Sequence, residues 1–356
     1  MEESAYFMAK RGADGRPPRV TIQDVARLAD VSVATVSAVI NGNVPVSEKR
    51  TERVRAAMAA LRYQPDERAR TLRTGRSRML GLVIPDVTNP FYPEMLREIE
   101  HAARVRDHSV LLCDSNNDPE QERRHLEALY ARRVDGALVA CVDSKVSYDW
   151  LDPLGFPVVF FERYPFSGHY QAISTDHRAA SFHATKHLIQ FGHRRIAFFL
   201  TNPDLSSSSE RTAGYQAAFA DAGVPMPPSM LIAHVEGAQG GYNAMRRLCA
   251  NPEKRPTALL CTNSVLLLGA ARAARESGLQ CPRDISLICF DNPVWTEHFP
   301  PAITTLAQPK GEIARRALEL LLARIEKKAP TLEESTIEWL KDELVVREST
   351  GPAPTP

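Results

Sequence analysis

The stretch from Thr21 to Asn41, TIQDVARLADVSVATVSAVIN, is typical of two short helices joined by a tight turn. Thr21 is a good N-cap, and Asp24 is placed to return the hydrogen bond. Apolar residues then recur at helical spacing and form one stripe: Ile22, Val25, Ala26, Leu28 and Ala29. Ser32 can cap the second helix, whose inward positions are Val36, Val39 and Ile40. This pattern predicts a compact helical pair near the start of the chain.

The outer face of the second helix carries only small or hydroxylic side chains, at Ala34, Thr35, Ser37 and Ala38. Such a face can approach a surface closely, which suits a recognition helix in the major groove of DNA. The alternative is an ordinary helical hairpin within a core, because the helix-turn-helix pattern alone has false positives.

A longer string of residues favours the first interpretation. It consists of Asp24-Val25-Ala26, Ala29, Val31-Ser32, Thr35-Val36-Ser37 and Val39-Ile40-Asn41. This string resembles the DNA-binding head of the LacI/GalR family of bacterial transcription regulators. The resemblance continues from about Val20 to Arg347 and implies a regulator that binds DNA and responds to a ligand, most commonly a repressor of carbohydrate or related catabolic genes.

Charge is distributed unevenly along the chain. Residues 1–78 contain 15 Lys and Arg against 9 Asp and Glu, whereas the remaining residues contain 29 against 34. A basic head on a mildly acidic body suits a polyanionic partner for the head alone. Without the helical pattern beside it, the imbalance would be read as chance.

The expected domains follow from composition and pattern. Residues 1–19 are predicted to be disordered, 20–63 to form a three-helix head with its third helix from Ser47 to about Leu61, and 348–356 to form a disordered tail. Residues 64–78 read as a short helix and linker. Such a helix is unstable alone, but the resemblance implies that it folds as a hinge on DNA and inserts Leu72 into the minor groove.

From Met79 onward, short apolar runs alternate with amphipathic helices in two successive series, which predicts an α/β core of parallel sheets. The family resemblance implies two lobes like those of periplasmic binding proteins. We expect a core over 79–347, with a first lobe of about 79–176 and 305–336 and a second lobe of about 177–304 and 337–347. The tail has no leucine heptad of the kind that builds tetramers, which favours a homodimer.

The six cysteines show no metal-ligand spacing and lie mostly in apolar runs, where reduced buried thiols are the default. No stretch is suited to span a bilayer, and the start of the chain lacks a signal-peptide core. We therefore expect a cytoplasmic protein, nucleoid-associated when bound to DNA, with no metal, cofactor or membrane partner.

The resemblance assigns two groups of residues to DNA. By match to the family, the residues that contact phosphates are Thr21, Ser32, Thr35, Asn41 and Tyr63. Positions that face bases or the minor groove are Val33, Ala34, Ser37, Ala38, Ala69, Leu72 and Arg73. Many family members carry Arg or His where this chain has Ala38, so part of the usual base readout is in doubt. The partner is expected to be a near-palindromic operator.

Candidate effector-binding residues follow the predicted strands, because open α/β sheets bind ligands at the carboxyl ends of their strands. They are Asp86, Phe91, Tyr92, Arg163, Ser207, Arg211, Glu236, Asn263, Asp291 and Trp295. The resemblance implies that the aromatic pair packs on the ligand, that Arg211 clamps a ligand oxygen and that Asp291 binds sugar hydroxyls. The alternatives are core packing for Phe91 and Tyr92 and a surface ion pair for Arg163. Two arginines in a cleft would suit an acidic sugar or another carboxylate, and the effector is expected to be a sugar or sugar acid.

One further departure concerns Asn263-Ser264, where the family usually has Asn-Asp. The missing carboxylate changes either the polar lining of the site or only a helix cap. Two other functions were weighed: a solute-binding protein, against which the basic head speaks, and a sugar or nucleotide enzyme. No nucleophile–base set, metal cluster or phosphate loop is visible in the sequence, so we expect no enzymatic activity.

Overall fold

The structure is a computed structural model that describes residues 20–42, 44–64, 75–253, 255–326 and 334–355. It divides into two compact units, Met1–Ser77 and Arg78–Pro356, and each is described by itself. Within the described ranges, no helix combines the length and the apolar character needed to cross a membrane.

The described residues of the first unit contain the three helices that were predicted: α2 (Ile22–Leu28), α3 (Val33–Asn41) and α4 (Glu48–Ala60). Thr21 and Asp24 form the expected capping box at the start of α2. The hydroxyl of Ser32 accepts from the Thr35 N–H at the start of α3, which ends at Gly42 with a left-handed φ of 64°. The N-caps therefore begin both helices where the sequence indicates.

A small apolar core joins these three helices. Its fully buried members are Val25, Ala26, Ala29, Val36, Val54 and Ala57. Leu28 differs from the predicted stripe, because its side chain is 56% exposed. The last turn of α2 carries it away from α4, since a seven-residue helix turns only one face inward. The guanidinium of Arg53 donates to the backbone and side-chain oxygens of Asp30, both at 2.8 Å, and ties α4 to the turn.

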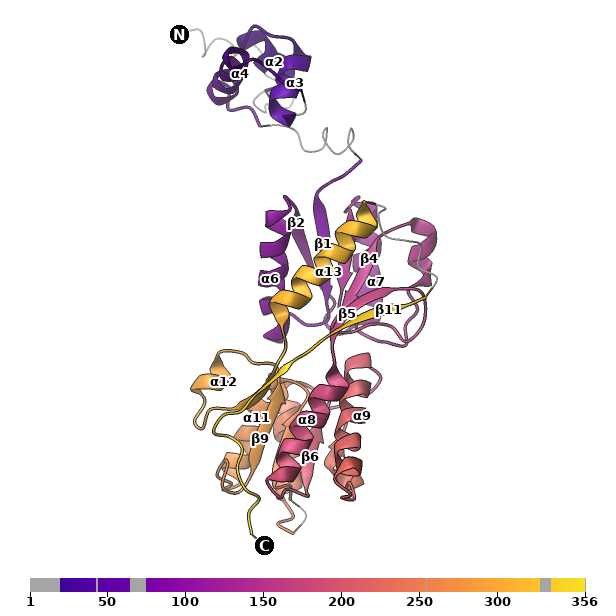
Figure 1. Cartoon of the computed structure of the whole chain (residues 1–356), viewed down its shortest axis with the longest axis vertical. Coiled ribbons are helices and arrows are strands. Elements are labelled where there is room, and N and C mark those ends of the chain that lie inside the picture. The colour runs from indigo at the N-terminus through magenta and orange to yellow at the C-terminus, as the bar shows by residue number, and fades with distance from the viewer. Residues whose placement is uncertain (1–19, 43, 65–74, 254, 327–333, 356) are drawn as a thin grey trace, which may run out of the picture. The chain divides into compact units, whose positions relative to one another are not determined.

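The second unit contains two lobes, each built on a six-stranded sheet (Figure 1). The first sheet has the order β11-β5-β4-β3-β1-β2. Its strands are β1 (Met79–Ile84), β2 (Ser109–Asp114), β3 (Gly136–Val139), β4 (Val158–Phe161), β5 (Gln171–Thr175) and β11 (Thr336–Leu340). The second sheet has the matching order β12-β10-β9-β8-β6-β7. Its strands are β6 (Ile196–Phe199), β7 (Leu231–Ile232), β8 (Ala258–Cys261), β9 (Ser286–Phe290), β10 (Thr304–Ala307) and β12 (Glu343–Val345).

The pairing is parallel as predicted, except that β12 runs antiparallel to β10. The same order in both sheets bears out two series of similar topology. Successive side chains of the central strands enter different cores on the two faces, which explains why these strands read as continuous apolar runs. On β1, for example, Leu82 lies in one core and Val83 in the other.

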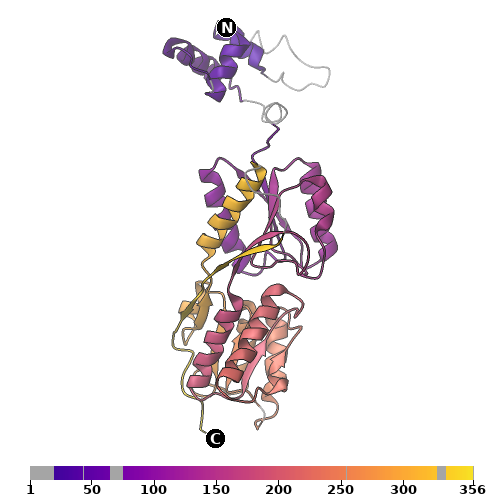
Figure 2. The ribbon, with the colours of Figure 1, turned by 45° about the vertical axis from the view of Figure 1, so that its right-hand side comes forward.

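Helices cover both faces of each sheet (Figure 2). In the first lobe, α6 (Phe91–Val105) and α13 (Lys310–Ile325) cover one face, and α7 (Pro119–Ala131) and the short η1 (Asp149–Leu154) cover the other. In the second lobe, α8 (His177–Gln190) and α9 (Ser206–Asp221) face α10 (Gly237–Cys249) and α11 (Ser264–Glu276) across the sheet. The short elements η2 (Pro228–Met230) and α12 (Trp295–His298) complete this lobe.

The chain crosses between the lobes three times, at positions that differ slightly from those expected. Strand β10 still pairs with β9 in the second sheet, and β11 still pairs with β5 in the first. The later crossings therefore lie at 308–309 and 341–342 rather than near 305 and 337. An apolar run shows that a strand exists, but the sheet it joins depends on its neighbours in space.

The tail is ordered through residue 355, which corrects the expectation of disorder from 348. The N–H of Leu287 donates to the carbonyl of Ser349 at 2.8 Å, and Gly351 N–H donates to the Ser286 hydroxyl at 3.1 Å. The imidazole of His193 lies 3.1 Å from the carbonyl of Gly351. These contacts hold in place a segment whose composition alone predicts a disordered tail.

Candidate effector cleft and DNA-binding head

The carboxyl ends of the parallel strands in both sheets face one hollow between the lobes. In each sheet the chain reverses its direction of winding next to the first strand, β1 or β6, and such a switch point is where open α/β sheets bind ligands. The residues that line the hollow all follow strands or begin helices: Asn89, Phe91, Tyr92, Glu162, Arg163, Thr201, Ser207, Ser208, Arg211, Thr262, Asn263 and Asp291.

Seven of the ten predicted effector residues line this hollow: Phe91, Tyr92, Arg163, Ser207, Arg211, Asn263 and Asp291. The other three do not. The Asp86 carboxylate accepts from the N–H and hydroxyl of Thr88 at 2.8 and 2.6 Å and shapes the local turn. Glu236 is an exposed residue before α10. Trp295 packs on the second-lobe core, with its ring centroid 5.8 Å from that of Phe299.

Arg211 makes the densest set of contacts in the cleft. From α9 its Nη2 donates to Glu162 Oε1 at 2.8 Å, and its Nη1 donates to the carbonyl of Thr262 at 2.8 Å. Its guanidinium carbon lies 4.0 Å from the ring centroid of Phe290. Glu162 follows β4 in the first lobe, so this ion pair connects the two lobes.

His177 completes the group as the first residue of α8. Its Nδ1 lies 3.3 Å from Arg211 Nη2, and its Nε2 lies 3.3 Å from Glu162 Oε2. Because an arginine nitrogen can only donate, Nδ1 accepts and Nε2 carries the proton. Neither Glu162 nor His177 is among the residues predicted from the sequence, although Glu162 stands directly before Arg163 at a strand end, which is the available signal.

Electrostatics explain how these buried groups coexist. Burial lowers the pKa of His177 below its usual 6.5, so the imidazole is neutral at pH 7. Burial raises the pKa of Glu162, but the adjacent His177 and Arg211 lower it by more, to about 2. With the imidazole neutral, the guanidinium of Arg211 is the charge that keeps Glu162 ionised.

Arg163 lies on the first-lobe side of the hollow, with its guanidinium carbon 5.8 Å from the ring centroid of Tyr92. Among the residues that the structure describes, no carboxylate lies within ion-pairing distance of it, which argues against the surface ion pair. Phe91 and Tyr92 each pack in the first-lobe core and also line the hollow.

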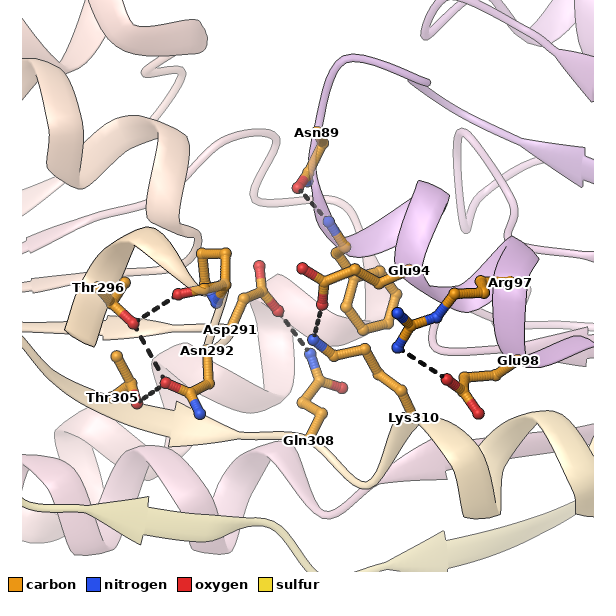
Figure 3. A network of polar contacts seen from close by, with 12 residues as sticks. Asn89, Glu94, Arg97, Glu98, Asp291, Asn292, Thr296, Thr305, Gln308 and Lys310 are labelled. Carbon is orange, nitrogen blue, oxygen red and sulfur yellow. Dashed lines mark hydrogen bonds and ion pairs between the residues drawn. The ribbon is translucent and has the colours of Figure 1, made fainter. Parts of the chain in front are cut away.

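Asp291 lies at the end of β9 with a left-handed φ of 69° and is almost completely buried. Its Oδ1 accepts from the side-chain amide of Gln308 at 3.0 Å (Figure 3). Burial raises its pKa from 3.8 to about 6, so the carboxylate is ionised at neutral pH. Figure 3 also shows Lys310 beside Gln308, with its ammonium group directed to Glu94 on α6.

Asn263 resolves the question raised by the missing aspartate. Its side-chain oxygen accepts from the Leu266 N–H at 2.9 Å and caps α11, and the residue also lines the hollow. Ser264, in place of the aspartate usual in the family, therefore leaves the cap of α11 intact. Across the described residues, no group of three or more His, Cys, Asp or Glu side chains is arranged to hold a metal ion.

In the head, the predicted DNA-binding residues lie along and beside α3. Ser32, Val33, Ala34 and Asn41 are exposed. The amide of Asn41 donates to the hydroxyl of Ser37 at 3.1 Å, and the hydroxyls of Ser32 and Thr35 lie 2.9 Å apart. Thr35, Ser37, Ala38 and Tyr63 are half-buried and Thr21 is exposed at its cap. Ala69, Leu72 and Arg73 lie outside the described residues.

Comparison with known proteins adds two matches to named families. The profile described as "Bacterial regulatory proteins, lacI family" matches residues 21–66, and that of a "Periplasmic binding protein-like domain" matches residues 185–350. The chain is 35% identical to the HTH-type transcriptional repressor PurR of Mannheimia succiniciproducens, over 92% of this chain and 98% of that protein. It is also 35% identical to the ribose operon repressor of Escherichia coli K12, over 89% and 96%.

Solved structures agree with these matches over nearly the whole length. A lac repressor dimer bound to operator and the anti-inducer ONPF superposes with a TM-score of 0.80 at 25% identity, covering 94% of this chain and all of that one. A complex of the transcriptional regulator CelR with cellobiose gives a TM-score of 0.70 at 28% identity, covering 93% and 100%.

Proposed function

The chain belongs to the lacI family of bacterial regulatory proteins, and on that premise we propose that it represses transcription under the control of a sugar or sugar acid. Members of the family are DNA-binding transcription regulators and not enzymes, so the hollow between the lobes is a sensing site. The observation that carries the proposal is that seven predicted effector residues, contributed by both lobes, line one hollow.

The head supplies the DNA-binding part of this function. A capped α3 with an exposed N-terminal end, Val33 and Ala34, fits a recognition helix whose first turn approaches base edges. These two side chains are apolar and suit thymine methyl groups. Two copies of the chain on a near-palindromic operator would place two such helices in successive major grooves, with Leu72 of each hinge at the minor groove.

The cleft supplies the response to a ligand. The three crossing segments between the lobes allow the lobes to change their separation when a ligand binds or leaves. A ligand that favours one arrangement shifts the first lobes of a dimer relative to each other, and this change forms or melts the hinge helices.

The proposed effector class has support in the cleft and in the relatives. Asp291 and Asn263 offer an acceptor and an amide to hydroxyl groups, and Tyr92 offers an aromatic wall. Among the relatives, one is named as a ribose operon repressor and another is a complex with cellobiose.

The experiment is a gel shift on the promoter region beside the protein's own gene, at several salt concentrations, with and without ligands found in a thermal-shift screen of sugars, sugar acids and nucleobases. Wild-type protein is expected to bind with strong salt dependence and to respond to the ligand. Leu72→Ala should weaken binding to the operator while the ligand still binds. Arg211→Ala and Asp291→Ala should bind the operator and lose the response. Absence of specific binding by wild-type protein would refute the proposal.

A further inference from the structure

The main cation of the cleft already has an internal counter-ion. The side chains of Arg211 and Glu162 are 6% and 4% exposed, and their closest nitrogen and oxygen lie 2.8 Å apart. The carboxylate of Glu162 therefore occupies the position on the Arg211 guanidinium that a ligand carboxylate would otherwise take. Buried charges need such a partner, since an unpaired ion in this position is strongly destabilising.

The empty cleft is closed around this pair. Its free volume is about 20 Å³, which is room for water and not for a sugar ring. Further contacts join the lobes beside it: the N–H groups of Ser206 and Tyr164 donate to the hydroxyls of Ser144 and Ser206 at 2.8 and 3.0 Å. A ligand can enter only when the lobes part, and that motion separates Glu162 from Arg211.

The charges that line the hollow balance within the protein. Arg163 and Arg211 are the two cations, and Glu162 and Asp291 are the two anions. An acidic ligand would add an uncompensated negative charge to this set and would meet two carboxylates. A neutral ligand leaves the balance intact. The number of arginines alone therefore overstates the attraction of the hollow for an acidic ligand.

The cleft also contains buried polar groups that have no hydrogen-bond partner within the protein. Arg211 Nε is a buried donor without a hydrogen-bond partner. The buried hydroxyl of Thr262 is likewise unpaired. A ligand hydroxyl can donate to one of these groups and accept from another, whereas a ligand carboxylate only accepts.

We propose that Glu162 is a specificity-determining residue that occupies Arg211 in place of an acidic ligand group, so that the cleft selects an uncharged polyhydroxyl effector over its carboxylate analogue. The inference rests on the proposed sensing function and narrows its effector class. Glu162 acts here through Arg211.

The first test needs no knowledge of the effector. Thermal unfolding of the full-length protein is followed at pH 7.5 in sodium formate and in sodium chloride of equal ionic strength. Wild-type protein should melt at the same temperature in both salts, because Glu162 blocks Arg211. Glu162→Ala should melt lower, by roughly 5 °C or more, and formate should restore part of the loss by binding Arg211.

Two controls make this result specific. Asp221→Ala removes the partner of the solvent-exposed Lys186 and should show no preference for formate. The double variant Glu162→Ala, Arg211→Ala should lose the effect of formate. Stabilisation of wild-type protein by formate, or a Glu162→Ala variant that is indifferent to formate, would overturn the inference.

The second test compares neutral and acidic ligands in pairs, such as D-ribose with D-ribonate and D-glucose with D-gluconate. Wild-type protein should be stabilised by the neutral member of a pair, and Glu162→Gln, which keeps the shape and removes the charge, should shift the affinity ratio about tenfold toward the acid. Wild-type preference for the acid would contradict the inference while leaving the sensing function intact. Failure of operator binding would instead refute the proposed function.

Discussion

The side-chain amide of Gln308 donates to the carboxylate of Asp291 at 3.0 Å, at the point where the chain leaves the second sheet for the first lobe. The carbonyl oxygen of the same amide accepts from the Thr175 hydroxyl at 2.6 Å. Thr175 ends β5 beside another crossing segment. One glutamine thus links a candidate ligand-binding carboxylate to two of the three connections between the lobes.

Gln308→Ala should therefore weaken the response to the effector more than the binding of DNA. The carboxylate of Asp291 loses a hydrogen bond that orients it, and hydrogen bonds to charged groups contribute about 1.5–3 kcal/mol. We expect at least a roughly tenfold loss of effector affinity by titration and unchanged operator affinity without ligand. Gln239→Ala, on the exposed side of α10, is the matched control. Equal effects of the two variants would argue against the link.

The parts of this molecule that the sequence predicted are those set by local chemistry. Thr21, Asp24 and Ser32 cap helices within four residues of themselves, and apolar runs mark strands whose two faces are both buried. The placement of Arg163 and Asp291 in the cleft also follows from a local rule, because each stands at the carboxyl end of a parallel strand.

The parts that were missed depend on contacts between distant segments. The partner of Arg211 comes from the other lobe, 49 positions away. The tail is held by backbone bonds to Leu287 and Ser286, which composition does not reveal. Likewise β10 and β11 join sheets according to their spatial neighbours and not to any residue within them.

A buried carboxylate in the first lobe makes stability depend on pH. Glu122 accepts from the Val142 N–H at 2.8 Å and from the Tyr148 hydroxyl. Burial raises its pKa from 4.5 to about 7 in spite of these bonds. The folded protein thus holds this proton more tightly than the unfolded chain does, and its contribution to stability falls as pH rises from about 4.5 to about 7.

Glu122→Gln removes the charge; its amide oxygen can accept from the Val142 N–H, and its amide nitrogen can donate to the Tyr148 hydroxyl oxygen, which reverses the second hydrogen bond. We expect the variant to gain stability relative to wild type as pH rises, by at least about 1 kcal/mol between pH 5 and pH 8. The measurement is thermal or urea unfolding at the two pH values, with the exposed Glu127→Gln on the same helix as control. A constant difference between variant and wild type across this range would contradict the assignment.

The ordered tail is expected to contribute to the stability of the second lobe. Deleting residues 348–356 removes the carbonyl of Ser349 from the Leu287 N–H and the N–H of Ala353 from the Phe191 carbonyl, which it donates to at 2.8 Å. Each buried group left unpaired costs about 1–3 kcal/mol. Urea unfolding should show a loss of roughly 2–4 kcal/mol, whereas deletion of residues 355–356 alone should change little. Equal free energies of unfolding of the two deletion variants would show that the contacts of the tail do not stabilise the protein.

Helices α10 and α11 pack so closely that one glycine between them has no room for a side chain. A Cβ on Gly269 would lie 1.7 Å from the carbonyl oxygen of Ala238, which is backbone and cannot turn aside. Gly269→Ala must therefore push the two helices apart, at a cost of at least about 1–3 kcal/mol as for other overpacked sites.

Gly311→Ala provides the control on α13, because its Cβ would lie 3.5 Å from the nearest heavy atom, the flexible end of Glu98. Alanine there lowers the entropy of the unfolded chain and should be neutral or stabilising by up to about 1 kcal/mol. Urea unfolding of both variants decides the matter: if Gly269→Ala is as stable as Gly311→Ala, the two helices do not meet at this position.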